Sequence, residues 1–334
     1  MTRAIAALIV LVFVAVTLLA ACGDGPAEEA DGTRPADLVL DWFPNADHAG
    51  IFTAIAGGHM ADAGVELVPE VPSDPAAALK QVGAGRAPFA VSYEPEVLLA
   101  RSQGIPVVAV AALVGTPLNA VIVRGDRGIT RPRDLEGRTV GISGLPSDRP
   151  LLDTVVRADG GDPAKVRTRS VGFNLSPALA AGRVDALVGA YWNIEAPELE
   201  RRGVPVEVFR LERFGVPAYD ELVLVTSDEI ARDDPALVRA VVRGLAAGTA
   251  AAVADRDAAV DAVAGANPDL DRDLLVEQVR LTAPLLGTGE GRSLAVDPDA
   301  WADYADWMRA ERLLTDPVDV GAAVTDRFQP EVEG

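Results

Sequence analysis

The chain has 334 residues, with 30 lysine and arginine residues against 50 aspartate and glutamate residues, two histidines and one cysteine. A net charge of −20 repels nucleic acid and anionic lipid, so we expect no nucleic-acid partner. The single cysteine excludes an intrachain disulfide and a thiolate metal cluster, and we expect no bound metal.

The N-terminal segment has the pattern of an export signal that ends in a lipid anchor. An apolar run from Ala4 to Ala21 follows the cationic Arg3 and closes in small residues directly before Cys22. An uncleaved membrane anchor would need a longer apolar span. The boundary resembles the lipobox of bacterial lipoproteins, so we predict a signal peptide over 1–21, a lipid on Cys22, and a protein anchored at the extracytoplasmic face of the cell membrane.

Residues 22–36 are small, acidic and aperiodic, which predicts a flexible tether. From Asp37 onward, short β-branched runs alternate with longer amphipathic segments, which is typical of an α/β fold with mainly parallel strands. The predicted strands cover 38–40, 65–68, 89–91, 107–110, 121–123, 139–142, 166–171, 186–188 and 222–225.

Helices are predicted in the gaps between these strands. Ser73, Asp74 and Pro75 supply the capping pattern of a helix that runs to about Ala84. After the last strand the chain is predicted to be helical over 235–254, 256–264, 271–286 and 297–314. Within the last of these helices, the spacing of Trp301, Tyr304, Trp307 and Met308 predicts a buried face.

Two lobes of similar build are predicted from a repeated pattern. Residues 182–188 repeat the form of residues 85–91, in which a helix end is followed by glycine, arginine and a strand. A second α/β series also begins at 134–142. About 300 residues are enough for two such lobes.

The densest group of unusual residues is 41–50. A strand ends at Asp41, a turn with proline and asparagine follows, and Asn45 or Asp47 can cap the helix that contains His48. Ligands of open α/β sheets bind where strands end and helices begin. We therefore expect Trp42, Asn45 and His48 to face a cleft, although each alone also fits a structural role.

A second group, 189–195, follows a later strand in the same way. Trp192 and Glu195 are three residues apart and Tyr191 and Glu195 four apart, so an aromatic ring and a carboxylate can share one helical face. Such a pair would stack on a planar ring and accept hydrogen bonds from its amino group. A core aromatic residue beside a solvated acid fits this pattern equally well.

Four segments, 41–50, 72–80, 92–101 and 189–195, resemble the substrate-binding proteins of ABC importers in the thiamine-pyrimidine family. Segments 171–175 and 215–222 extend the match, so it spans roughly Leu38 to Thr226. The resemblance implies a type II periplasmic-binding-protein fold, in which two α/β lobes are joined by a two-strand hinge and enclose the ligand. It also implies an ABC permease as a partner, and we expect a monomer.

The resemblance implies site residues on both lobes. From the first lobe, the cleft would be lined by Trp42, Asn45, His48, Ser92, Tyr93 and Glu94. From the second lobe, it would be lined by Tyr191, Trp192, Asn193 and Glu195, with Gly144 and Asn174 as weaker candidates from loops after strands. The crossings would lie near 121–123 and 219–222, which divides the chain into a first lobe of 37–122 and 222–334 and a second lobe of 123–221.

The enzyme branch of the family differs from this chain in one respect. The eukaryotic pyrimidine-precursor synthase carries a cysteine-rich iron segment and a lysine that holds pyridoxal phosphate, whereas this chain has only Cys22, Lys80 and Lys165 of these residue types. We therefore predict a binding protein without a cofactor, and not an enzyme. Two alternatives stay open: a secreted enzyme that uses His48 with Glu195 or Glu94 as acid and base, and the same binding fold with a flavin or other nitrogen heterocycle as its ligand.

Overall fold

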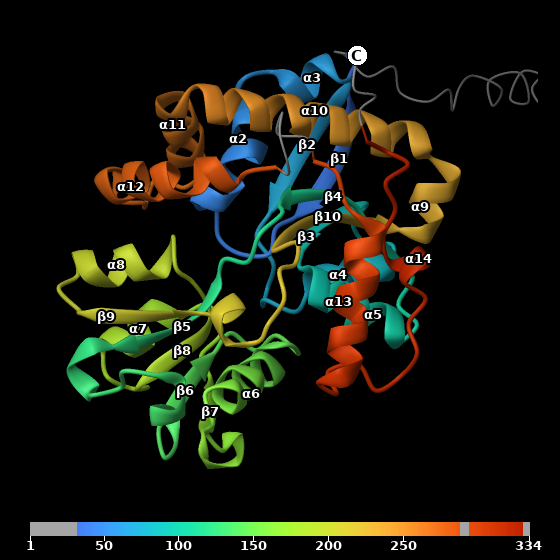
Figure 1. Ribbon diagram of the computed structural model, residues 1–334. Coiled ribbons are helices and arrows are strands. Elements are labelled where there is room, and N and C mark those ends of the chain that lie inside the picture. Colours follow the sequence, from blue (N-terminus) through green and yellow to red (C-terminus); the bar gives the residue numbers. More distant parts are fainter. Residues whose placement is uncertain (1–31, 288–293, 330–334) are drawn as a thin grey trace, which may run out of the picture. The chain divides into compact units, whose positions relative to one another are not determined.

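Two five-stranded sheets with helices packed against them organise the described part of the chain (Figure 1). The computed structural model describes residues 32–287 and 294–329, so the predicted signal peptide and the predicted lipid on Cys22 lie outside the described residues. From Pro35 onward the chain packs as one unit, which contains both sheets. The predicted tether over 22–36 is too long, because β1 already begins at Arg34.

The first sheet has the strand order β2-β1-β3-β10-β4. Leu38 of β1 lies opposite Phe89 of β3 in a parallel pair, whereas β10 is antiparallel to both of its neighbours. All eight residues of β4 are buried, as expected for a strand with helices on both faces. The strands are β1 (Arg34–Val39), β2 (Val65–Glu70), β3 (Phe89–Ser92), β4 (Val107–Val114) and β10 (Leu222–Ser227).

The second sheet repeats this build with the order β7-β6-β8-β5-β9. In each sheet, the strand that follows a crossing between the sheets enters antiparallel to its neighbours: β5 in the second sheet and β10 in the first. The predicted fold class, with two α/β lobes of similar build, is confirmed. The strands are β5 (Asn119–Arg124), β6 (Thr139–Ile142), β7 (Arg167–Ser170), β8 (Ala186–Tyr191) and β9 (Val206–Arg210).

The first crossing lies earlier than predicted. The chain leaves the first sheet after β4 and passes through residues 115–118 into β5. The whole of β5 belongs to the second sheet. The expected crossing at 121–123 is therefore wrong, because Val121 sits in the middle of β5 opposite Phe209 of β9. The return passes through 215–221, which agrees with the crossing expected near 219–222.

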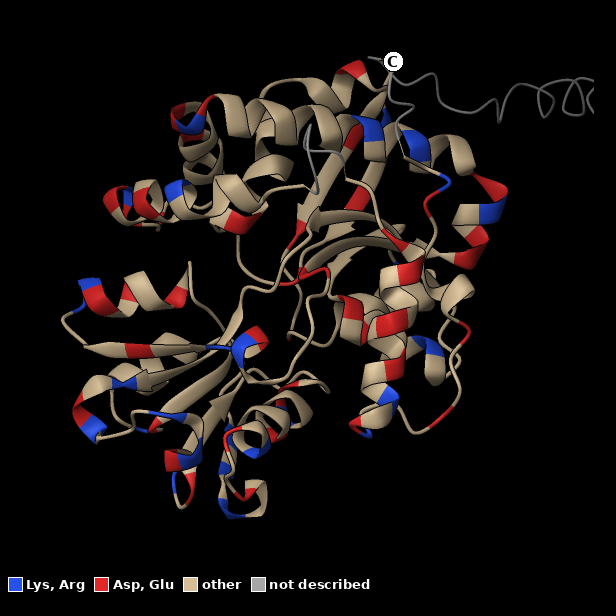
Figure 2. Cartoon of the chain, viewed as in Figure 1, with Lys and Arg blue, Asp and Glu red and all other residues tan. Residues whose placement is uncertain are grey.

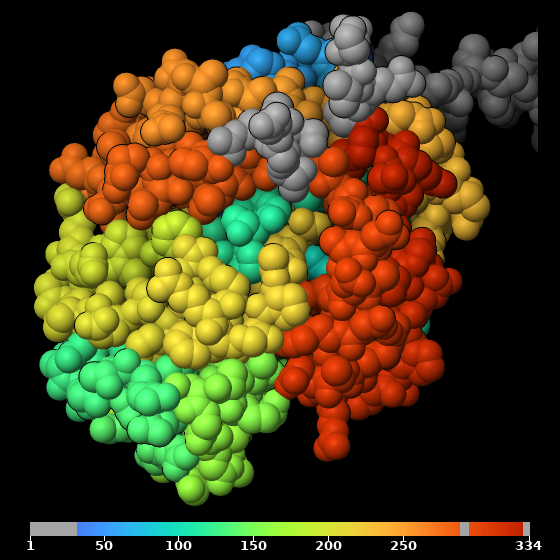
Figure 3. Space-filling model, in the orientation of Figure 1, coloured from blue at the N-terminus to red at the C-terminus, as the bar shows by residue number. Residues whose placement is uncertain are grey.

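Helices cover both lobes, and Figure 3 shows the C-terminal helices, from orange to red, over the first lobe. In the first part of the chain they are η1 (Ala46–His48), α2 (Ala49–Ala56), α3 (His59–Asp62), α4 (Ala78–Gly83) and α5 (Glu94–Ser102). In the second lobe they are η2 (Gly125–Arg127), η3 (Pro132–Leu135), α6 (Asp148–Ala158), η4 (Pro163–Lys165), α7 (Leu175–Ala180), α8 (Glu195–Arg201) and η5 (Leu211–Phe214). After β10 they are α9 (Asp228–Asp233), α10 (Pro235–Ala254), α11 (Arg256–Ala266), α12 (Arg272–Thr282), η6 (Ala283–Leu285), α13 (Pro298–Ala310) and α14 (Val320–Ala323).

One predicted helix starts late and one strand was missed. The helix expected from residue 73 begins at Ala78, because the Asp74 carboxylate accepts the amide of Ala76 at 3.0 Å and holds a turn instead. Strand β9 was not predicted, although the alternating sequence of 206–209 is typical of an edge strand.

Most charged residues lie on helices and loops rather than on the strands (Figure 2). Helix α10 is long and apolar enough to cross a membrane by composition, yet half of it is buried in the fold, where it packs on α2 as a core helix. The predicted buried face of α13 is confirmed, because Trp301, Tyr304 and Met308 are buried and Trp307 is partly buried.

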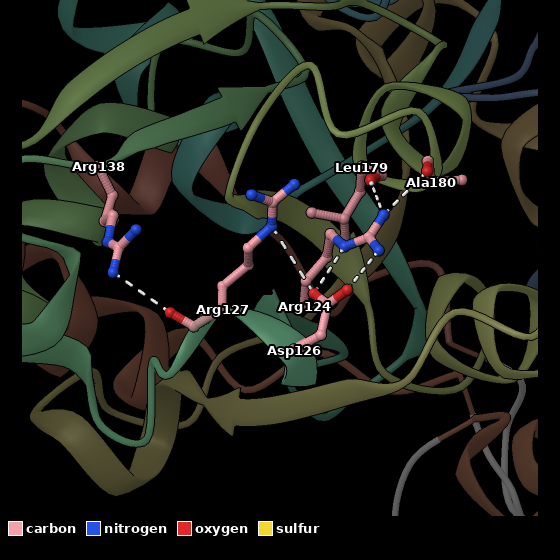
Figure 4. A network of polar contacts seen from close by, with 6 residues as sticks. All are labelled: Arg124, Asp126, Arg127, Arg138, Leu179 and Ala180. Carbon is pink, nitrogen blue, oxygen red and sulfur yellow. Dashed lines mark hydrogen bonds and ion pairs between the residues drawn. The ribbon is translucent and has the colours of Figure 1, made fainter.

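Arg124 ties the end of β5 to the C-terminus of α7 (Figure 4). Its guanidinium donates to the carbonyl oxygens of Leu179 at 3.3 Å and Ala180 at 2.9 Å, and to the carboxylate of Asp126 at 2.7 Å. A cation at this place satisfies carbonyl groups that the helix itself leaves without partners. This contact fixes the outer corner of the second lobe.

Candidate functional site

A pocket lies between the two lobes, at the carboxyl ends of β1, β3, β6 and β8. About 540 Å³ of space between protein atoms, the solvent-open mouth included, lies among its lining residues. The crossing segments between the sheets form its floor. Its lining residues are Asp41, Trp42, Asn45, Tyr93, Pro95, Asn119, Ser143, Leu145, Ser147, Leu151, Gly189, Tyr191, Ile194, Glu195, Tyr219 and Glu221.

Asp41 anchors the wall that the first lobe contributes. Its Oδ1 lies 2.8 Å from Nε2 of His48, and its Oδ2 accepts the hydroxyl of Tyr93 at 2.8 Å. The backbone N–H of Asn45 points to Nδ1 of His48 at 3.3 Å, so Nδ1 is an acceptor and the proton sits on Nε2. His48 is therefore a neutral donor that orients Asp41.

Asn45 shows why the sequence folds this way after β1. Its side-chain oxygen accepts the backbone N–H of Asp47 at 2.8 Å, which caps η1 and confirms one of the two predicted caps. The cap turns the chain sharply after Pro44. Trp42 and Asn45 consequently lie on the pocket side of the turn.

Glu195 is the carboxyl group that the second lobe contributes. Its Oε2 accepts the backbone N–H of Tyr191 at 2.6 Å, and burial raises the pKa of its carboxyl to about 8. Tyr191 ends β8 and lines the pocket beside it. An aromatic ring and a carboxyl group thus face the pocket together.

Glu221 joins the two crossing segments at the floor of the pocket. Its Oε2 accepts the backbone N–H groups of Leu118 at 2.7 Å and Asn119 at 2.9 Å, and the hydroxyl of Tyr219 at 2.9 Å. Tyr191 also hydrogen-bonds this carboxyl, and burial raises its pKa to about 7. A ligand that touches Glu221 therefore touches the hinge directly.

The lining has a consistent chemical character. It combines the carboxyl groups of Asp41, Glu195 and Glu221 with several aromatic rings, and the described lining includes no lysine or arginine. Acceptors beside flat apolar surfaces fit a planar ring that carries amino groups. They fit an anionic ligand poorly, because a buried anion needs cationic or N–H partners.

The lobes are closed over this pocket. Asn193 of the second lobe donates to Asp47 of the first at 2.6 Å, and Glu96 accepts the backbone N–H of Ser147 at 3.0 Å. The guanidinium of Arg201 bridges to Asp271 at 3.1 Å, where α8 meets α12. In Figure 3 the orange C-terminal helices abut the yellow-green part of the second lobe.

Trp42 adds an aromatic contact to this closed interface. Its ring packs edge to face against Phe173 of the second lobe, with 4.5 Å between the ring centroids. Trp42 lines the pocket and also a second, more open groove that Phe43, Pro44 and Phe173 help to form, so it lies between the two spaces.

The structure brings five of the predicted site residues into the pocket lining: Trp42, Asn45, Tyr93, Tyr191 and Glu195.

Three predicted residues of the first lobe lie elsewhere. His48 stays behind the wall, fully buried. Ser92 is buried within β3 opposite Val223, and because side chains alternate along a strand, it is Tyr93 that reaches the pocket. Glu94 turns to the return crossing, where its Oε2 accepts the backbone N–H of Asp220 at 2.8 Å.

Two predicted residues that follow β8 also lie outside the pocket lining. Tyr191 points into the pocket, so Trp192 points away from it and packs under the guanidinium of Arg210, 4.4 Å from the ring centroid. Asn193 is fully buried and bridges Asp47 and Thr282. It holds the closed lobes together and does not reach the ligand space.

The two weaker candidates are also outside the lining. Gly144 directs its N–H to Asp148 at 2.8 Å, although its neighbours Ser143 and Leu145 do line the pocket. Asn174 is exposed.

Sequence reasoning missed the residues of the two crossings. Asn119 begins β5 directly after the first crossing, and Tyr219 and Glu221 lie in the return crossing; all three line the pocket. The signal available was the family match at 215–222, which includes Tyr219 and Glu221. Asp41 was assigned to the end of a strand and not to the site. The other missed residues are Pro95, Ser143, Leu145, Ser147, Leu151, Gly189 and Ile194.

Comparisons with known proteins agree with this architecture. The NMT1/THI5 like family model matches residues 45–259. The formylaminopyrimidine-binding protein of Halalkalibacterium halodurans is 33% identical over 325 residues, which cover 95% of this chain and 98% of that protein. A 4-amino-5-hydroxymethyl-2-methylpyrimidine phosphate synthase of Legionella pneumophila is 25% identical, with 88% of this chain and 92% of that protein covered.

A solved structure shares the fold at lower identity. The alkanesulfonate-binding protein SsuA of Xanthomonas axonopodis superposes with a TM-score of 0.71 and 17% identity, over 87% of this chain and 98% of that chain. The expected periplasmic-binding-protein fold is thereby confirmed.

Proposed function

Because this chain belongs to the NMT1/THI5-like family, we propose that it is the solute-binding component of an ABC importer and that it captures an aminopyrimidine related to the precursors of thiamine. A relative named for formylaminopyrimidine binding, aligned over almost the whole chain, supports this ligand class. The partner is then a permease in the membrane.

The pocket chemistry carries the proposal. An aminopyrimidine offers amino N–H donors at its edge and a flat aromatic face. The carboxyl groups of Asp41, Glu195 and Glu221 accept such donors, and Trp42 supplies a ring beside them. A ligand edge that bridges Glu195 and Glu221 contacts the second lobe and the hinge at once.

A binding role is favoured over an enzymatic one by the position of the two lysines. Lys80 is exposed and lies outside the pocket lining, and Lys165 pairs with Glu136 at 3.1 Å on the surface of the second lobe. Neither reaches the ligand space of the closed form. His48, the acid or base of the alternative enzyme, is hydrogen-bonded to Asp41 and lies behind the pocket wall.

Calorimetric titration with a panel of ligands tests the function. Formylaminopyrimidine and 4-amino-5-hydroxymethyl-2-methylpyrimidine are expected to bind, whereas riboflavin and an alkanesulfonate are not. Glu195→Gln is expected to weaken pyrimidine binding about two- to tenfold, because burial keeps the Glu195 carboxyl largely uncharged near neutral pH and a hydrogen bond between uncharged groups contributes ~0.5–1.5 kcal/mol.

The matched control for Glu195→Gln is Glu198→Gln. Glu198 lies on the same helix but pairs with Arg202 at 2.6 Å outside the pocket. If riboflavin binds and both pyrimidines do not, the ligand class is wrong. If both glutamine variants weaken binding equally, Glu195 has no direct role.

We also propose that Cys22 carries a lipid that holds the protein at the outer face of the cell membrane. The small-residue boundary before Cys22 and the acidic stretch after it support this anchor. Cys22→Ala is expected to move the protein from the membrane fraction to the soluble fraction or to block its processing. A Cys22→Ala protein that is still cleaved after Ala21 and stays in the membrane would contradict the anchor.

A further inference from the structure

The turn after β6 is built like an anion-binding site that the chain itself occupies. The backbone N–H groups of Gly144 and Leu145 and the hydroxyl of Ser143 all point to one oxygen, Oδ2 of Asp148, at 2.8, 3.1 and 2.8 Å. Asp148 is the first residue of α6, an 11-residue helix. Convergent backbone N–H groups in such a turn can bind an anion, and here they bind the Asp148 carboxylate.

This turn forms part of the pocket wall. Ser143, Leu145, Ser147 and Leu151 line the pocket, and Asp148 is fully buried directly behind them. The same carboxyl lies against Gly189, which also lines the pocket.

Gly189 is itself constrained by this carboxyl. Its φ is +78°, and a Cβ placed there would lie 2.6 Å from Oδ1 of Asp148, so a side chain at this position would clash. The carboxyl of Asp148 thus lies directly against the backbone of Gly189, a residue of the pocket wall.

The second oxygen of Asp148 is not paired in the same way. Oδ1 is buried, and within residues 32–287 and 294–329 it has no hydrogen-bond partner. Burial raises the pKa of this carboxyl to about 6, while the three hydrogen bonds to Oδ2 oppose that rise. At neutral pH the group is mainly ionised, and it places a negative charge behind the pocket wall.

We propose that Asp148 determines the specificity of this pocket: its carboxylate fills the anion-binding turn, so the protein accepts an unphosphorylated pyrimidine and rejects the phosphate ester of the same compound. Two effects act together. The N–H donors that a phosphate would need are already used, and a like charge lies behind the wall, where its repulsion is weakly screened. The inference rests on the proposed function for the ligand class, but the role of Asp148 in excluding phosphate does not.

The experiment compares two probes that differ only in the phosphate: 4-amino-5-hydroxymethyl-2-methylpyrimidine and its phosphate ester. In the unchanged protein, calorimetry is expected to give an affinity for the ester about 100-fold or more below that for the alcohol, because like charges placed together in a desolvated site cost several kcal/mol. Equal affinities would overturn the proposal without any variant.

Two substitutions then locate the effect. Asp148→Asn removes the charge and keeps an oxygen for the amides, and Asp148→Ala frees the amides as well. Both are expected to raise the affinity for the ester relative to the alcohol about tenfold or more. The control is Asp153→Asn, which removes the same charge from the same helix at a residue that pairs with Arg149 outside the pocket, and which is expected to leave the ratio unchanged.

Inorganic phosphate separates this inference from the proposed function. Asp148→Ala is expected to bind inorganic phosphate, whereas the unchanged protein is not. Line broadening in the phosphorus NMR spectrum measures this binding. If neither pyrimidine binds but Asp148→Ala gains phosphate binding, the role of Asp148 stands and the ligand class is wrong. If folded Asp148 variants show the same ester-to-alcohol ratio and the same response to phosphate as the unchanged protein, Asp148 does not set specificity.

Discussion

The hydrogen bonds of Asp41 show which residues face the pocket and which only hold them in place. Asp41 has two oxygens, one held by His48 and one by Tyr93, at 2.8 Å each. His48 can hold it only as the neutral tautomer with its proton on Nε2, because the Asn45 amide occupies Nδ1. The most conspicuous residue of the 41–50 segment is thus a support for Asp41, and the carboxylate is the group that meets the pocket.

The two tryptophans that follow strand ends have different roles, and substitution separates them. Trp42→Ala is expected to weaken pyrimidine binding by ~1–3 kcal/mol, or about one to two decades in dissociation constant, because stacking of a base on an aromatic ring contributes that much. Trp192→Ala is expected to leave the affinity nearly unchanged, since Trp192 packs under Arg210 and not in the pocket. Calorimetric titration of both variants, with thermal unfolding to confirm the fold, makes this comparison. A folded Trp192→Ala protein that loses affinity as strongly as Trp42→Ala would refute the assignment.

At the scale of elements, the close crossing of α10 over α2 fixes the outer layer of the first lobe. Gly248 of α10 lies against Ala54 of α2, and a Cβ at Gly248 would come within 2.3 Å of the Ala54 Cβ and 2.5 Å of its Cα. Gly50 of α2 meets Thr249 in the same way. Small residues on both helices allow the backbones to approach, and α2 in turn carries the end of the 41–50 segment that forms the pocket wall.

This close approach predicts opposite effects for two glycine substitutions in helices. Gly248→Ala is expected to lower the free energy of unfolding by ~1–3 kcal/mol, because overpacking outweighs the better helix propensity of alanine. Gly265→Ala in α11 is the control: a Cβ there meets no atom of the described residues within 4 Å, so the change is expected to raise the free energy of unfolding by ~0.5–1 kcal/mol. Urea unfolding of both variants measures the difference. Stabilisation by Gly248→Ala would mean that the helices separate easily at this crossing.

For the whole molecule, closure buries carboxyl groups that belong to both sides of the interface. Burial raises the pKa of Asp47 to about 6, of Glu96 to about 7 and of Glu195 to about 8. Asp47 meets Asn193 and Glu96 meets Ser147 only while the lobes are closed. The hydrogen bonds from Asn193 and Ser147 lower these two pKa values, but burial raises them by more, so protonation and the closed form are linked through burial.

The sign of this linkage predicts a pH-dependent opening. The pKa of Glu96 is higher in the closed form than in water, so the closed form binds the proton more tightly. Protonation of Glu96 therefore stabilises the closed form relative to the open form. This stabilisation is complete below the ordinary pKa of 4.5 and is lost as the pH rises through about 7. The unliganded protein is thus expected to have a larger radius of gyration at pH 8.5 than at pH 5.5 in small-angle scattering. Saturating pyrimidine at pH 8.5 is expected to restore the smaller value.

Glu96→Gln removes one of the titrating groups and is expected to reduce the change in radius between the two pH values. Circular dichroism at both pH values distinguishes opening from unfolding. A radius that is independent of pH, or that falls as the pH rises, would show that the buried carboxyl groups do not oppose closure.

The sequence alone determined the class of fold, the similar build of the two lobes, the cap at Asn45 and the buried face of α13, because these follow from local periodicity, capping chemistry and a family pattern that runs along the chain. It also located five lining residues, all within or beside strand ends. Only the tertiary structure decided that Tyr191 and not Trp192 faces the ligand space. Adjacent side chains at a strand end point in opposite directions, so a shift of the strand by one residue would exchange their positions. Likewise, Glu221 became a site residue only when β5 paired with β8 and β9 and brought both crossings under one pocket. That pairing joins segments distant in the chain, and no local pattern encodes it.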